Sequence, residues 1–316
     1  MARFSMFSAA SLLLLSGLLS TSAAGQATPV PDEGATPHFN VDTTLVQIPA
    51  TVTDPSNRFV LGLRKEDFHI FEDGVEQTIA HFSGEEAPLS IGLLFDASGS
   101  MDDKLRTSRR AALRFLQTMN AQDEAFLIQF GDHAQVAVEF THQIDQIQTK
   151  LAAIQPGGLT ALLDAAEMAL HEMKKATNAR KAILIVSDGG DNNSKYSASQ
   201  IQSLVREADV QVYAMGVFEP PLFPSLSKEE VSGPRLLSEL AEQTGGRAFT
   251  ASDPNDLSSV ASRIGIELRN QYVLAYSPKN QAKDGKFRKV EVKVSPPAGI
   301  PTIKLHWRLG YYAPAQ

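Results

Sequence analysis

Six short apolar segments, separated by stretches with helical periodicity, constrain the fold of this chain more than any other feature. The apolar segments are 89–95, 125–130, 135–140, 182–187, 210–217 and 247–250. The helical stretches lie near 104–119, 143–153, 160–175, 198–208, 234–244 and 255–269. Apolar strands that alternate with helices require a mostly parallel sheet covered on both faces. We therefore predict a doubly wound, six-stranded α/β domain with an antiparallel edge ribbon that turns near 131–133.

The segments on either side of this domain have a β-like pattern. Strands are expected at 45–52, 68–71 and 75–79 before the domain, and at 271–276, 286–294 and 303–308 after it. Each group is too small to bury a core easily by itself. We therefore predict that the two groups pair into one accessory β-sandwich-like module. The expected boundaries are 39–86 for the N-terminal β segment, 87–270 for the α/β domain and 271–316 for the C-terminal β segment.

The N-terminus has the pattern of an export signal. Arg3 precedes an apolar core over 6–19, and the small residues 22–24 suit a signal peptidase. We expect a signal peptide over 1–24, followed by a proline-rich polar linker over 25–38. The apolar core is shorter than a membrane-spanning helix needs, and no later run is long enough to span. These features predict an exported protein, periplasmic or extracellular, without a membrane span after cleavage.

The composition of the chain argues against a nucleic-acid partner and against stabilisation by disulfide bonds. The formal net charge is -7 and no block rich in lysine or arginine offsets it, so a nucleic-acid partner is not expected. The chain has no cysteine, so its fold is held by its core or by a metal rather than by disulfides. Composition leaves the oligomeric state open.

Oxygen-bearing side chains follow the first and fourth apolar segments. The sequence Asp96-Ala97-Ser98-Gly99-Ser100 closes the first of these segments, and Asp188 follows the fourth. Thr160 stands between them, directly after a glycine-rich turn and before a helical stretch. Carboxylate and hydroxyl oxygens that converge at one edge of a sheet suit a hard cation such as Mg²⁺. The alternative is that these residues only form turns and helix caps.

The order and spacing of these five residues resemble the metal-ion-dependent adhesion site of von Willebrand factor type A (VWA) domains. The resemblance implies that Ser98, Ser100 and Thr160 bind the cation directly, while Asp96 and Asp188 bind through water or switch to direct contact. It implies Mg²⁺, with Mn²⁺ or Ca²⁺ as alternatives, and a partner protein whose Asp or Glu carboxylate completes the metal's ligands, as in cell adhesion.

The order of segments extends this resemblance over nearly the whole mature chain. An export signal, a short β segment, an adhesion-type domain and the closing residues 310–314 are similar to the exported VWA-related proteins common in acidobacteria. In related domains the helix corresponding to 256–270 can shift with ligand state, which makes this helix a candidate reporter of binding.

Two other functions remain open. A metal-dependent hydrolase would need a general base, but the motif segments contain no histidine, and the seven histidines lack a metal-ligand spacing. Glycine loops of nucleotide enzymes and the Gly-x-Ser-x-Gly elbow are also missing, so we expect no enzyme and no catalytic residue. In the second alternative, the metal only rigidifies the loops. Asp102, Asp103 and Asp191 are interpreted as solvated loop residues, with charges near the metal site as the alternative.

Overall fold

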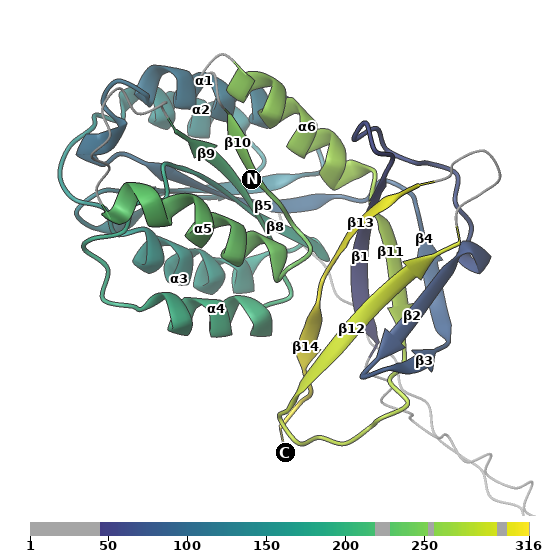
Figure 1. Ribbon diagram of the computed structural model, residues 1–316. Helices are drawn as coiled ribbons and strands as arrows, with labels where there is room; N and C mark the ends of the chain where they lie inside the picture. The colour runs from purple at the N-terminus through teal and green to yellow at the C-terminus, as the bar shows by residue number, and fades with distance from the viewer. Residues whose placement is uncertain (1–44, 219–227, 252–255, 296–301, 316) are drawn as a thin grey trace, which may run out of the picture. The chain divides into compact units, whose positions relative to one another are not determined.

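A computed structural model describes residues 45–218, 228–251, 256–295 and 302–315. The export signal and linker predicted over 1–38 lie outside these residues. A six-stranded sheet with the order β10-β9-β8-β5-β6-β7 forms the centre of the α/β domain (Figure 1). Its strands are β5 (Leu89–Asp96), β6 (Glu124–Phe130), β7 (Ala134–Thr141), β8 (Arg180–Ser187), β9 (Gln211–Val217) and β10 (Ala248–Ala251).

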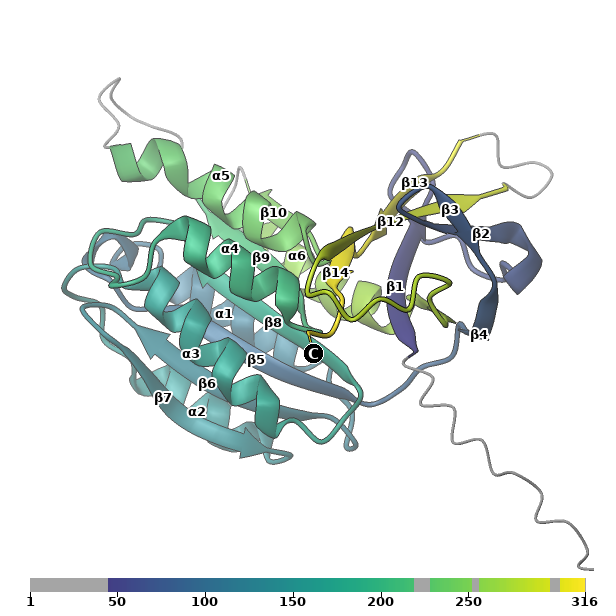
Figure 2. The same cartoon turned by 90° about the horizontal axis from the view of Figure 1, so that it is seen from below.

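Helices cover both faces of this sheet. One face carries α1 (Leu105–Leu116), α2 (Ile144–Ala153) and α6 (Leu257–Arg269); the other carries α3 (Leu162–Glu172), α4 (Ala198–Glu207) and α5 (Lys228–Glu242) (Figures 1 and 2). Neighbouring strands run parallel except β6 and β7, which are antiparallel. The predicted doubly wound fold with its antiparallel edge is therefore confirmed.

The segments before and after the α/β domain build two further sheets together. One has the order β13-β1-β11-β4 and the other β14-β12-β2-β3. The strands from the N-terminal side are β1 (Val46–Thr53), β2 (Phe68–Glu72), β3 (Val75–Gln77) and β4 (Ile79–Ser83). Those from the C-terminal side are β11 (Tyr272–Tyr276), β12 (Phe287–Val294), β13 (Lys304–Trp307) and β14 (Gly310–Tyr312). Each sheet contains two strands from either side, and the two sheets bury one shared core, which confirms the predicted accessory module.

Three elements differ from their predicted form. The expected strand over 75–79 is divided into β3 and β4, which belong to different sheets. Helix α5 begins at Lys228 rather than near Pro234. A proline commonly marks the first turn of a helix, but this one lies inside it. Strand β14 was not predicted, because its three residues are too few to show an alternation.

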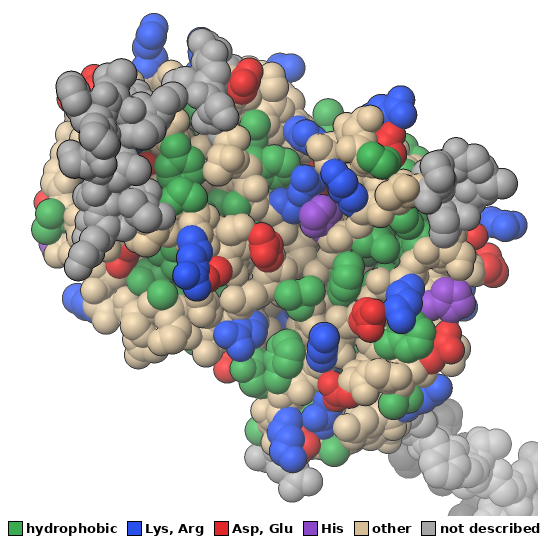
Figure 3. Space-filling view, viewed as in Figure 1, with side chains coloured by type: hydrophobic (Ala, Val, Ile, Leu, Met, Phe, Trp, Pro, Cys, Tyr) green, Lys and Arg blue, Asp and Glu red, His purple; other side chains and the backbone are tan. Residues whose placement is uncertain are grey.

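Charged side chains are spread over the face shown in Figure 3, where acidic and basic groups are interspersed. This distribution agrees with the small excess of 36 acidic over 29 basic residues in the sequence.

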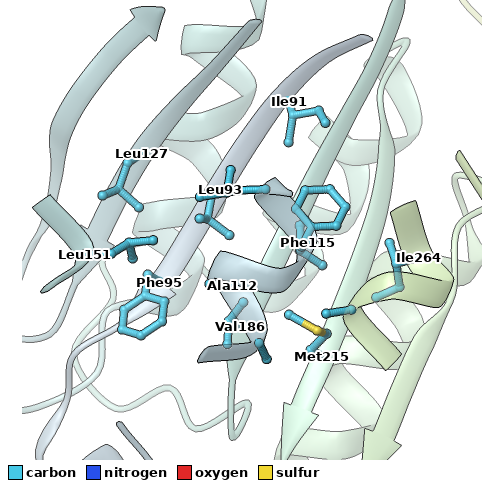
Figure 4. Close-up of a cluster of buried hydrophobic side chains, with 14 of the residues drawn as sticks. Ile91, Leu93, Phe95, Ala112, Phe115, Leu127, Leu151, Val186, Met215 and Ile264 are labelled. Carbon is cyan, nitrogen blue, oxygen red and sulfur yellow. The ribbon is translucent and has the colours of Figure 1, made fainter. Parts of the chain in front are cut away.

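The core of the α/β domain explains why β5 is apolar along its whole length. Ile91, Leu93 and Phe95 point to the face that carries α1, where they pack near Phe115 (Figure 4). Leu94 belongs to the cluster on the opposite face. Every residue of β5 is buried, so the strand is held rigidly in the centre of the sheet, and its carboxyl end presents Asp96.

Candidate functional site

Two neighbouring parallel strands bring the predicted carboxylates to one edge of the sheet. Strands β5 and β8 are paired in register, with Phe95 opposite Val186. Asp96 is the last residue of β5, and Asp188 directly follows β8. The loops that leave these strands therefore start side by side at the carboxyl edge, where ligands of open α/β sheets bind.

Asp96 is fully buried and receives two hydrogen bonds. Its Oδ1 accepts from the backbone N–H of Ser98 at 2.9 Å, and its Oδ2 accepts from the hydroxyl of Ser187. Burial raises the pKa of Asp96 to about 6, with a smaller contribution from the charge of Asp188, while the bonds from Ser187 and Ser98 oppose this shift. Ser187 was predicted only as the end of a strand, although its position before Asp188-Gly189 indicates a role in the loop.

The hydroxyls of Ser98 and Ser100 lie next to each other. Their Oγ atoms are 3.1 Å apart, where the chain enters the short 3-10 helix η2 (Gly99–Met101). Ser98 is buried, whereas Ser100 is exposed, so the site opens to solvent on the Ser100 side. Two neighbouring ligands of an octahedral ion, each about 2.1 Å from the metal, are about 3 Å apart. The serine pair therefore fits two adjacent positions of such an ion.

The loop that carries Thr160 is tied to the Asp96 loop by backbone hydrogen bonds. Gly99 N–H donates to the carbonyl of Gly158 at 3.0 Å, and Gly157 N–H donates to the carbonyl of Ala97 at 2.8 Å. Gly158 has a φ of 79° and its Cα lies so close to Asp132 that a Cβ would come within 2.5 Å of that carboxylate. Glycine is therefore required at this turn.

Thr160 itself is 4% exposed and is fixed by the loop that follows β8. Its N–H donates to Oδ1 of Asn192 at 2.8 Å, and its carbonyl accepts from Asn192 and Asn193, each at 3.0 Å. Helix α3 begins two residues later, at Leu162. The loop after β8 thus positions both Thr160 and Asp188.

Asp188 is 7% exposed and has a cation beside it. The ammonium of Lys104 donates to its Oδ2 at 3.1 Å, and Gly190 N–H lies 3.3 Å from its Oδ1. Helix α5 contacts the same loop, because Gly189 and Gly233 approach so closely that a Cβ on Gly233 would lie 2.5 Å from the Asp188 carbonyl oxygen. Neither Lys104 nor Gly233 was predicted to lie near Asp188, because both are far from it along the chain.

The other acidic residues near the motifs have different surroundings. Asp102 and Asp103 are exposed. Asp191 accepts hydrogen bonds from the hydroxyl of Ser194 at 2.5 Å and from the N–H of Leu163 at 3.2 Å, so it caps the start of α3. This capping role differs from the solvated position interpreted for Asp191.

The proposed donor set at the edge of the sheet is two carboxylates and three hydroxyls. Within the described residues, no group of three or more His, Cys, Asp or Glu side chains could hold a metal ion. Hydroxyl oxygens can also bind a hard cation, and the spacing of Ser98 and Ser100 fits a small divalent cation. The pairing of Asp188 with Lys104 is the one feature of this donor set that opposes a cation.

Comparisons with known proteins agree with the fold. The model of the von Willebrand factor type A domain matches residues 90–263, more than half of the chain. An uncharacterized protein of Borreliella burgdorferi is 23% identical over 188 residues, which are 53% of this chain and 55% of that protein. The chain thus spans about half the length of this curated relative.

Solved structures are similar at low sequence identity. A von Willebrand factor type A protein from Catenulispora acidiphila is 12% identical with a TM-score of 0.51, over 88% of this chain and 75% of that chain. The vWF domain of the type V pili tip protein Mfa5 from Porphyromonas gingivalis is 13% identical with a TM-score of 0.48, over 57% and 95%. In the described parts of this chain, no helix has the length and apolar character needed to cross a membrane.

Proposed function

Since the chain belongs to the von Willebrand factor type A domain family, we propose that it is an exported module that binds a partner protein through a divalent cation. The residues that would hold the cation are Asp96, Ser98, Ser100, Thr160 and Asp188. Mg²⁺ is the proposed ion, with Mn²⁺ and Ca²⁺ as alternatives. The proposed partner group is the carboxylate of an Asp or Glu side chain.

The observation that carries this proposal is the position of Asp96 beside the serine pair. The buried carboxylate of Asp96 lies two and four residues before two hydroxyls that are 3.1 Å apart, at an edge of the sheet that is open on the Ser100 side. A cation bound there would supply positive charge and an open coordination position for an oxygen of a partner. Neutral hydroxyl ligands leave more of that charge for the partner than carboxylate ligands would.

A binding role is favoured over hydrolysis by the groups around the donor set. The loops that carry the five residues contain no histidine that could act as a general base. Asp96 accepts hydrogen bonds from a hydroxyl and a backbone N–H, which hold the carboxylate still rather than move a proton. These contacts support a site that binds and orients. The rigidifying role of a metal remains the second candidate.

Direct metal binding is the first test. We expect the purified wild-type protein to bind Mn²⁺ in calorimetry, and Asp96→Ala and Thr160→Ala to lose this binding while circular dichroism shows an intact fold. Asp102→Ala is the matched control, because it removes an exposed carboxylate close to the motif. Absence of Mn²⁺ and Mg²⁺ binding by the wild-type protein would contradict the proposal.

Partner capture distinguishes the candidate functions. Affinity capture from periplasmic or secreted fractions should retain a protein in the presence of Mg²⁺ and lose it with chelator or with Thr160→Ala. Metal-dependent turnover would instead indicate a hydrolase. Thermal stabilisation by Mg²⁺ without any metal-dependent partner would indicate the rigidifying role.

Export has a separate test. Expression of the full chain should yield a secreted or periplasmic form whose mass corresponds to the loss of residues 1–24. A form that keeps these residues and stays in the cytoplasm would contradict the proposed location.

A further inference from the structure

A lysine forms an ion pair with one of the proposed metal ligands. The Nζ atom of Lys104 is 3.1 Å from Oδ2 of Asp188, and only 14% of the lysine side chain and 8% of the aspartate side chain are exposed. Ion pairs on the surface contribute little, but a pair this sheltered is screened weakly by solvent. The ammonium is therefore a substantial part of the charge at this edge of the sheet.

The backbone of Lys104 is fixed by hydrogen bonds, while its side chain is long and flexible. The residue precedes α1, and its carbonyl accepts hydrogen bonds from the N–H groups of Thr107 and Ser108 at 3.1 and 2.9 Å. Its four-carbon stem has several rotatable bonds. If the ammonium left Asp188, it would therefore remain close to the site.

Without a metal, the charges of Asp96, Asp188 and Lys104 do not sum to zero. Asp96 and Asp188 together contribute two negative charges and Lys104 contributes one positive charge. With a divalent cation added, the cluster carries one excess positive charge, and one carboxylate from a partner would neutralise it. Without Lys104, the same cluster would already be neutral before a partner binds.

We propose that Lys104 occupies the cation position at Asp188 when no metal is bound, and thereby makes metal binding and carboxylate binding depend on each other. This inference rests on the proposed function. Like charges repel, so the ammonium weakens the affinity for a divalent cation. A bound carboxylate offsets this repulsion, so it raises the affinity for the cation, and by linkage the cation raises the affinity for the carboxylate equally.

The test uses charge variants of the full mature chain and Mn²⁺ as the metal. Lys104→Gln keeps a hydrogen-bond donor for Asp188 but removes the charge, and Lys104→Arg keeps the charge. Lys150→Gln is the matched control, because it makes the same change in net charge at an exposed position of α2. Affinity for Mn²⁺ is measured by calorimetry in acetate and in chloride at equal ionic strength.

We expect Lys104→Gln to bind Mn²⁺ about tenfold more tightly than the wild-type protein, and the other two variants to stay within about twofold of it. Acetate should raise the Mn²⁺ affinity of the wild-type protein by a larger factor than that of Lys104→Gln. In chelator, Lys104→Gln should melt at a lower temperature than Lys150→Gln, because the repulsion between Asp96 and Asp188 is no longer offset.

The outcomes separate this inference from the proposed function. Equal or weaker Mn²⁺ binding by Lys104→Gln would overturn the inference and leave the metal site standing. If Lys104→Gln binds Mn²⁺ more tightly but acetate raises the Mn²⁺ affinity of both proteins by the same factor, metal binding does not depend on a carboxylate through Lys104, and that part of the inference is overturned. If neither the wild-type protein nor Lys104→Gln binds Mn²⁺, the proposed function fails, and this inference fails with it.

Discussion

At the scale of single residues, Gly233 allows α5 to approach the loop that carries Asp188. A Cβ at this position would lie 2.5 Å from the Asp188 carbonyl oxygen and 2.9 Å from the carbonyl carbon of Gly189. We expect Gly233→Ala to push helix and loop apart, with a loss of about 1–3 kcal/mol in the free energy of unfolding and weaker Mn²⁺ binding. Chemical denaturation and calorimetry measure the two effects. Gly190→Ala is the control, because its Cβ would meet Asp188 Oδ1 at an ordinary 3.4 Å. Wild-type values for Gly233→Ala would contradict the requirement for glycine.

His306 on β13 gives the stability a dependence on pH. Burial lowers its pKa to about 4, Arg247 and Lys304 contribute in the same direction, and Glu242 opposes them. The unfolded chain therefore binds a proton near pH 6.5 that the folded chain does not bind, so this histidine makes the protein less stable as the pH falls from about 6.5 to about 4.

Replacement of this histidine should remove that loss. Because the site is only half-buried, solvent screening reduces the effect of the full shift. We expect His306→Gln to gain about 1 kcal/mol relative to the wild-type protein when denaturation at pH 5 is compared with pH 7.5. His81→Gln, at an exposed position of β4, is the control. A constant difference between His306→Gln and wild type at both pH values would contradict this explanation.

At the scale of elements, a buried carboxylate joins the two sheets of the accessory module. Glu72 on β2 accepts hydrogen bonds from the hydroxyls of Tyr276 on β11 and Tyr311 on β14, each at 2.8 Å. Burial raises the pKa of both tyrosines, and the carboxylate of Glu72 adds to this shift, so both stay protonated as donors.

Removal of either donor should destabilise the module. We expect Tyr276→Phe and Tyr311→Phe each to lower the free energy of unfolding by about 1–3 kcal/mol, because the acceptor is charged and buried. Their effects should not be additive, since they share one acceptor. Tyr312→Phe is the control, because the ring of Tyr312 packs on Phe287 while its hydroxyl has no hydrogen bond in the described part of the chain. Losses below about 0.5 kcal/mol in both variants would contradict a stabilising role for this cluster.

The elements themselves follow from local patterns to different degrees. The apolar run before Asp96 predicts a central strand, because burial on both faces leaves no polar alternation. The turn at Asp73-Gly74 is equally local, since both residues adopt positive φ angles that suit a tight hairpin. The alternation of apolar and polar residues can continue from β3 into β4 although the two strands belong to different sheets. The sequence pattern therefore does not show where the strand is divided.

The residue types of the proposed metal site and their order can be read from the sequence, whereas the positive charge beside Asp188 cannot. Asp96, Ser98 and Ser100 lie on one short loop, so their closeness follows from the sequence itself. Lys104 and Asp188 are 84 positions apart. Their pairing depends on where α1 begins relative to the end of β8, which no local pattern determines.

At the scale of the whole described chain, the accessory module and the proposed metal site lie at opposite ends of β5. A cavity of ≈ 40 Å³ is lined by residues at the amino ends of β5, β8 and β9 together with Gln47, Val273 and Arg308. The loops of the metal site leave the carboxyl ends of the same strands. The eight residues of β5 separate the two by about 25 Å.

Arg308 makes polar contacts between the module and the α/β domain. It is buried, its Nη1 donates to Oδ1 of Asp209 at 2.7 Å, and its Nη2 donates to the carbonyl of Ala208 at 3.2 Å. We expect Arg308→Met to lower the free energy of unfolding by about 1–2 kcal/mol, because the hydrogen bonds of the guanidinium are lost. The loss is limited, because Asp209 is exposed enough to be solvated after the change. Arg235→Met, which removes an exposed ion pair on α5, should change stability by less than about 0.5 kcal/mol.

The same variant tests whether the two ends of the sheet act independently. Strand β5 between them is buried along its whole length, and the charges of the proposed metal site lie about 25 Å from Arg308, which is farther than a Debye length. We therefore expect Arg308→Met to keep the Mn²⁺ affinity of the wild-type protein within about twofold while it loses stability. A larger change in affinity would mean that the module and the metal site are coupled, and that the accessory sheets do more than hold the α/β domain.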